Sequence, residues 1–158
     1  MKKIIYYWSP CLNKVGTVKS TINSAISLAK YSTDFDVRII NVFGEWSDYK
    51  KYLSKNHVEV ENLFFSYDKF LPKFGFFKSR LSYLIISFIS FIPLFYLLKK
   101  NKTEYFIAHL ITSLPLIIFN IFNFDTKLIL RISGYPKLNI LRKNFWNFSK
   151  KKIFKVTC

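Results

Sequence analysis

The sequence predicts one α/β domain, Rossmann-like and doubly wound around a mostly parallel sheet. A chain of 158 residues suits a single domain that buries a sizeable core. Short apolar runs typical of buried strands alternate along the chain with longer segments of helical spacing. A strand, a helix and a second strand fit within residues 3–43, which is typical of a βαβ unit and indicates parallel strands.

The first βαβ unit follows from local signals. Residues 3–8 form a continuous apolar run ended by a Ser-Pro pair, as expected for a strand covered on both faces. Thr17 is the expected N-cap of a helix that ends near Tyr31. Residues 37–43 are expected to form the next strand, which Gly44 ends.

The same alternation continues through the rest of the chain. Further strands are expected within 58–65 and over 105–110, 127–132 and 153–156. The helices between the strands are expected over 47–55, 81–98, 113–122 and 138–150. Strands separated by helices in this way predict one doubly wound domain over residues 1–158.

The formal net charge of +16 comes from 25 basic and 9 acidic residues. The basic residues are 21 Lys and only 4 Arg, and part of the lysine excess is consistent with AT-rich codon usage. Base readout and bidentate phosphate binding usually draw on Arg, so we expect no nucleic-acid partner. Two stretches without any acid, 69–102 and 126–158, favour an anionic membrane surface or phosphorylated sugar substrates instead.

The apolar helix over 81–98 has three interpretations. Its length of about 27 Å is near the lower limit for crossing a bilayer, so a small basic integral membrane protein, with a possible second span over 111–124, is one alternative. A helix buried against the sheet is another. We favour a helix that packs one side on the sheet and turns the other to a membrane surface, with Lys99 and Lys100 near anionic headgroups. Lysines flank both ends without asymmetry, and the α/β pattern resumes afterwards, which argues against a span.

Ligands of doubly wound sheets bind outside the carboxyl ends of the strands. The segments to inspect are therefore 9–16, 44–46, 109–113 and 131–136. They contain no dinucleotide-binding or P-loop glycine motif, and no metal-ligand spacing occurs, so we expect no metal and no cofactor. Cys11 and Cys158 form no CxxC pair and are expected to be reduced thiols of a cytoplasmic protein.

Several of these segments resemble glycosyltransferase family 4. The chain is similar to the start of such enzymes in its first strand, its first glycine loop and helix, and its second strand. It also resembles the family's central strand, which ends in His, and the next strand with its glycine-bearing loop. The residues concerned are 3–10, 15–17, 24–29, 36–41, 105–110 and 128–134.

The resemblance implies the N-terminal half of a GT-B fold, in which two Rossmann-like domains face each other across a cleft. This half mainly holds the acceptor. The C-terminal nucleotide-sugar domain, with its Glu-x7-Glu motif, would then be absent, and the last expected strand, 153–156, suggests a piece of something longer. The chain alone is expected to be inert.

The activity implied is that of a retaining glycosyltransferase of cell-envelope polysaccharide biosynthesis. It would move a sugar from a nucleotide-sugar, which is a substrate rather than a cofactor, to a lipid-linked or polysaccharide acceptor. The expected location is cytoplasmic, peripheral on the inner face of the cell membrane. The expected partners are these substrates, the anionic membrane and the C-terminal domain.

The resemblance also assigns site residues. His109 is the predicted catalytic residue, because the family's matching histidine lies near the reacting sugar. The predicted substrate-binding residues are Asn13, Lys14, Gly16, Arg131 and Gly134. Structural interpretations stay open beside these roles: a glycine that only makes a turn, a satisfied histidine at a strand end, and an arginine paired with a buried carboxylate.

Overall fold

The computed structural model describes residues 2–10, 16–64, 76–101, 103–109, 114–132 and 140–157. Its strands are β1 (Lys3–Trp8), β2 (Phe35–Asn41), β3 (Val58–Asn62), β4 (Thr103–His109), β5 (Lys127–Arg131) and β6 (Ile153–Thr157). Its α-helices are α1 (Gly16–Tyr31), α2 (Lys50–Lys55), α3 (Phe76–Lys100), α4 (Leu114–Ile121) and α5 (Ile140–Ser149). Single 3-10 turns precede α2 and β6, at Ser47–Tyr49 and Lys150–Lys152.

The six strands form one sheet in the order β3-β2-β1-β4-β5-β6, and every neighbouring pair is parallel. The predicted Rossmann-like doubly wound fold is confirmed. Strands β2 and β3 follow β1 outward on one side of it. The chain then returns through α3, and β4 pairs with the other side of β1. The reversal creates a switch point between β1 and β4, where ligands of such sheets bind.

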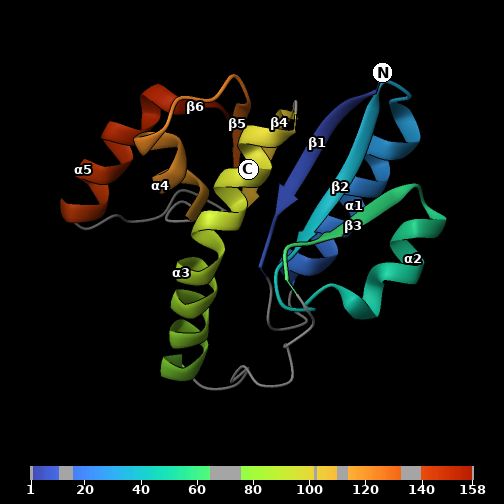
Figure 1. Ribbon diagram of the computed structural model, residues 1–158, viewed down its shortest axis with the longest axis horizontal. Coiled ribbons are helices and arrows are strands. Elements are labelled where there is room, and N and C mark those ends of the chain that lie inside the picture. Colours follow the sequence, from blue (N-terminus) through green and yellow to red (C-terminus); the bar gives the residue numbers. More distant parts are fainter. Residues whose placement is uncertain are drawn as a thin grey trace.

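Helices cover both faces of the sheet (Figure 1). In that view α1 and α2 lie on the right, and α3, α4 and α5 lie on the left. Side chains that alternate along β1 feed the two cores: Ile5 and Tyr7 pack with α1 and α2, whereas Tyr6 and Trp8 pack in the cluster that includes the α3, α4 and α5 residues. Alternate side chains of β1 therefore contribute to two separate apolar cores, one on each face of the sheet.

The predicted helix over 81–98 is confirmed as the central part of α3, which extends beyond this range at both ends. One side of the helix is buried, whereas apolar residues on the other side, such as Phe88 and Ile92, are 86% and 64% exposed. The strands before and after it, β3 and β4, belong to the same sheet. In the part of the chain that the structure describes, no helix combines the length and apolarity that crossing a bilayer requires.

The start of α1 differs by one residue from the prediction. The helix begins at Gly16, so Thr17 lies in its first turn and is not the N-cap. Helix starts are set by the geometry of the preceding loop as well as by the capping side chain, and that loop, residues 11–15, is outside the described residues.

The turn after β2 is organised by the buried Asn41. Its Oδ1 accepts hydrogen bonds from the backbone N–H groups of Gly44 and Trp46, and its Nδ2 donates to Oδ1 of Asn62 on β3. Gly44 has a φ of 109°, a backbone conformation that favours glycine. The indole N–H of Trp46 then donates to the carbonyl of Ser9, which connects this turn to the end of β1.

We predict that Asn41→Ala lowers the free energy of unfolding by about 2–3 kcal/mol, because buried backbone donors lose their acceptor. Urea denaturation followed by circular dichroism measures the change. Asn56→Ala is the matched control, since the Asn56 side chain donates to the Tyr52 carbonyl at an exposed position and its loss should cost less than about 1 kcal/mol. Equal losses in the two variants would contradict the proposed role of Asn41.

Candidate functional site

The carboxyl ends of β1, β4 and β5 meet the first turns of α1 at the switch-point edge of the sheet. A cavity of about 510 Å³ opens there. Its lining consists of polar or small residues along one side of α1 and one cation from the end of β5: Gly16, Lys19, Ser20, Asn23, Ser24, Ser27 and Arg131. Two of the predicted site residues, Gly16 and Arg131, thus border one cavity.

His109 is the last residue of β4 and lies next to this cavity. Its register partner on β5 is Arg131. The imidazole is only 5% exposed, and its Nε2 lies 3.3 Å from Oγ1 of Thr21 on α1. Oγ1 of Thr21 also lies 2.9 Å from the Thr17 carbonyl and 3.3 Å from Oγ of Ser9, and the tautomer of His109 decides whether Nε2 donates to Thr21 or accepts from it.

Burial and charge both keep His109 neutral. Burial is the larger cause, and the neighbouring Arg131 cation adds to it; together they lower the pKa of His109 to about 4. A neutral imidazole can accept or donate a hydrogen bond, but it adds no positive charge that would attract a phosphate. The described contacts make His109 a residue that links β4 to α1.

Arg131 ends β5 with its guanidinium turned toward α1. Its described hydrogen bond is a long one, 3.4 Å from Nη1 to the carbonyl of Ser20. Among the described residues no carboxylate forms an ion pair with Arg131. A half-buried guanidinium that borders a cavity can accept an anionic ligand.

Gly16 starts α1 without a conformational need for glycine. A Cβ placed there would meet no atom within 4 Å, and the backbone does not adopt a positive φ at this residue. The turn-glycine alternative therefore has no support in the described backbone. The open space around Gly16 belongs to the cavity, where a ligand could approach the main chain.

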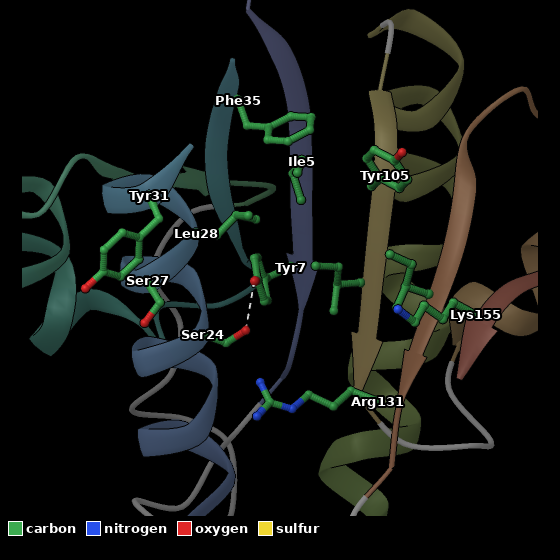
Figure 2. Close-up of a pocket in the computed structure, with 12 residues that line it drawn as sticks. Ile5, Tyr7, Ser24, Ser27, Leu28, Tyr31, Phe35, Tyr105, Arg131 and Lys155 are labelled. Carbon is green, nitrogen blue, oxygen red and sulfur yellow. Dashed lines mark hydrogen bonds between the residues drawn. The ribbon is translucent and has the colours of Figure 1, made fainter. Parts of the chain in front are cut away.

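A second cavity, of about 710 Å³, continues from the first along the sheet (Figure 2). The two cavities share Ser24, Ser27 and Arg131. Figure 2 shows α1 as one wall, with Tyr31 and Leu28, and the strands as the opposite side, with Tyr105 and Arg131. The space is mostly apolar, and we call it the sheet groove.

The remaining predicted residues, Asn13, Lys14 and Gly134, lie outside the described residues. Sequence reasoning missed the polar side of α1. Its signal was the spacing of Gly16, Ser20, Ser24 and Ser27 at intervals of three or four residues, with Lys19 in the first turn. Such spacing aligns small side chains on one helix face, which here borders the cavity.

The chemistry that this edge offers is recognition of an anion. Lys19 and Arg131 supply positive charge, and serine hydroxyls and Asn23 supply neutral hydrogen-bonding groups. Within the described ranges, no group of three His, Cys, Asp or Glu side chains could hold a metal ion. The arrangement suits an anionic ligand that can also form hydrogen bonds.

Comparison with known proteins adds no identification. No protein-family model matches the sequence, and a search of the curated proteins returned no match. The resemblance to glycosyltransferase family 4 remains a hypothesis that depends on the residues quoted above.

We predict that His109 makes folding stability fall in acid. Its folded pKa of about 4 lies below the ordinary value of 6.5, so the unfolded chain binds a proton first as the pH falls. The contribution is fully present above pH 6.5 and is lost progressively toward pH 4. Between pH 7 and pH 5 the loss attributable to His109 is about 2 kcal/mol.

Urea titrations at both pH values test this prediction. The drop in the free energy of unfolding should be about 2 kcal/mol smaller in His109→Asn than in the parent chain. His57→Asn, in an exposed turn, should retain the parent's drop. If His109→Asn shows the full drop as well, burial of a neutral His109 does not explain the acid sensitivity.

Proposed function

We propose that this chain is the acceptor-side domain of a retaining glycosyltransferase with GT-B architecture. It would hold a lipid-linked or polysaccharide acceptor while a sugar is transferred from a nucleotide-sugar. The observation that carries the proposal is the cation Arg131, without a described carboxylate partner, in a polar cavity at the switch-point edge of a Rossmann-like sheet. Sugars linked through a diphosphate match this charge.

The proposal includes a second, nucleotide-sugar domain. In the family that the chain resembles, the Glu-x7-Glu motif belongs to that domain, and no pair of Glu residues in this sequence has that spacing. Stabilising the leaving diphosphate is a principal electrostatic task of such transfer, and two cations at one edge do not supply it alone. Binding, without turnover, is the activity to expect of this domain.

The proposed location is the inner face of the cell membrane, reached through α3. Its exposed side carries apolar residues at intervals of three or four positions, and the cations Lys99 and Lys100 follow at its end. The exposed apolar residues are Leu81, Leu84, Phe88, Ile89, Ile92 and Tyr96. An apolar stripe beside lysines favours contact with an anionic lipid surface.

We predict that diphosphate-linked sugars bind at Arg131. Isothermal titration calorimetry would use two probes, UDP-glucose and a sugar linked to a short-chain isoprenyl diphosphate. Arg131→Gln should weaken binding about 10–100-fold, because hydrogen bonds to charged groups are worth about 1.5–3 kcal/mol. Lys19→Gln should weaken it to a lesser degree, since Lys19 acts as a point charge.

The matched control is Lys51→Gln, an exposed cation on α2 away from the cavity, which should bind like the parent. Thermal melting of each variant separates loss of binding from loss of folding. The proposal fails if neither probe binds, or if Arg131→Gln binds both probes as well as the parent chain does.

We predict that the chain floats with anionic vesicles and does so through α3. In density-gradient flotation, vesicles containing phosphatidylglycerol should carry the protein, and pure phosphatidylcholine vesicles should carry much less. The double variant Phe88→Ser/Ile92→Ser should reduce binding at least about tenfold, because two apolar side chains no longer enter the interface. Tyr52→Ser, an exposed aromatic residue on α2, should have no effect.

Carbonate extraction of cell membranes separates this proposal from the integral-membrane alternative. A surface-docked domain is released by carbonate, whereas an integral protein resists it. Resistance to extraction, or flotation that the double variant leaves intact, would count against docking through α3.

A further inference from the structure

Among the residues that the structure describes, half of each sheet face carries no helix, and the two open halves differ in chemistry. On the face that carries α3, α4 and α5, the open half lies over β2 and β3. There Arg38 pairs with Asp36 at 2.6 Å, with Glu61 at 3.1 Å and with Glu59 at 3.5 Å. Such a half-face is charged and suits contact with water.

The opposite half-face, over β4, β5 and β6, is apolar. It forms the floor of the sheet groove, with Tyr105 and Ile107 from β4 and Ile129 from β5, all half-buried. Phe154 of β6 lies beside Tyr105 at a ring separation of 6.1 Å and is 59% exposed. Parallel sheets are normally covered on both faces, so an apolar half-face of this kind is suited to a covering element.

The charged side chains that line the sheet groove are cations, and at its amino end Lys127 lies over the rings of Tyr105 and Phe154 while paired with Glu104 at 3.0 Å. Arg131 lies at its carboxyl end and Lys155 on its β6 side, and the lining includes no carboxylate. Figure 2 shows Lys155 and Arg131 on the strand side of the groove, opposite the wall formed by α1. An occupant with an apolar side and flanking acidic groups would complement this arrangement.

The dimensions of the groove suit a helix. In the register of β4 and β5, Tyr105 pairs with Lys127 and His109 with Arg131. Four residues of strand span about 13 Å, which is the length of about nine residues of α-helix. The α1 wall on one side and the open sheet on the other form a trough between them, as helix-in-groove recognition requires.

We propose that the sheet groove is the docking site for an amphipathic helix of a partner protein, with apolar residues on one side and Asp or Glu beside them. A second copy of this chain is a poor occupant, because none of its five described α-helices contains an Asp or Glu. This proposal does not depend on glycosyl transfer. It concerns the face of the sheet, whereas the proposed substrate site lies at its carboxyl edge.

Selection from a displayed peptide library tests the proposal. Fourteen-residue helical peptides would carry leucines at helical spacing, with Glu, Lys and Ser randomised at the flanking positions, and would be selected on the full chain. We expect the enriched peptides to be rich in Glu. Fluorescence anisotropy should show that an enriched peptide binds about tenfold more weakly to Lys155→Glu and at least tenfold more weakly to Ile129→Trp, which fills the groove.

Matched controls are Lys51→Glu and Ser54→Trp on the exposed side of α2, and both should bind the peptide like the parent. Lys155→Glu lies on an exposed strand position and tests the charge even if Ile129→Trp does not fold. Salt should weaken the parent's binding more than that of Lys155→Glu, because one attractive pair is gone.

Three results would overturn the proposal: no enrichment, enrichment of basic or uncharged peptides, and binding that neither variant changes. Self-association of the chain in sedimentation velocity that Ile129→Trp abolishes would identify a second copy as the occupant and would also overturn it. Titration of the peptide-free chain with diphosphate-linked sugars reports separately on the proposed function. Peptide binding without sugar binding would leave only the docking proposal standing.

Discussion

The parallel pairing of β1 with β4 is the constraint on which the rest of the structure depends. The pairing places the second half of the chain beside the first strand, so that the carboxyl ends of β1, β4 and β5 meet the start of α1. The crossover through α3 must then lie on the face opposite α1, because such connections are right-handed. The site, the sheet groove and the exposed side of α3 all follow from this one adjacency.

Much of the fold was predictable because strand and helix periods are local properties. Apolar runs such as 3–8 and 127–132 were confirmed as strands β1 and β5, and the interior of α3 was confirmed as helical. The strand order was not predicted, since it depends on which distant segments pair, and a run such as 105–110 carries no mark of its neighbour. The predicted N-cap of α1 was wrong by about one residue for a similar reason, because the geometry of the preceding loop also determines where the helix begins.

The candidate site was predictable only in part. His109 and Arg131 stood out as polar residues at the ends of apolar strands, and the structure places them side by side. The contribution of α1 depends on how that helix is rotated over the sheet, which packing against Tyr7 and its neighbours decides. Burial of His109 under Thr21 likewise arises from tertiary contacts, so the sequence could not distinguish a buried imidazole from one open to a ligand.

Charged side chains are paired at one end of the sheet and less so at the other. On β2 and β3 the carboxylates gather around Arg38, so that local cation is balanced. At the other end of the sheet Arg131 has only a carbonyl among the described groups, although it lies where the carboxyl-edge cavity and the sheet groove meet. A cation shared by two cavities is sensitive to occupancy of both. An anion bound at the edge would reduce the positive field along the groove, so a bound phosphate and a docked acidic helix would oppose one another through Arg131.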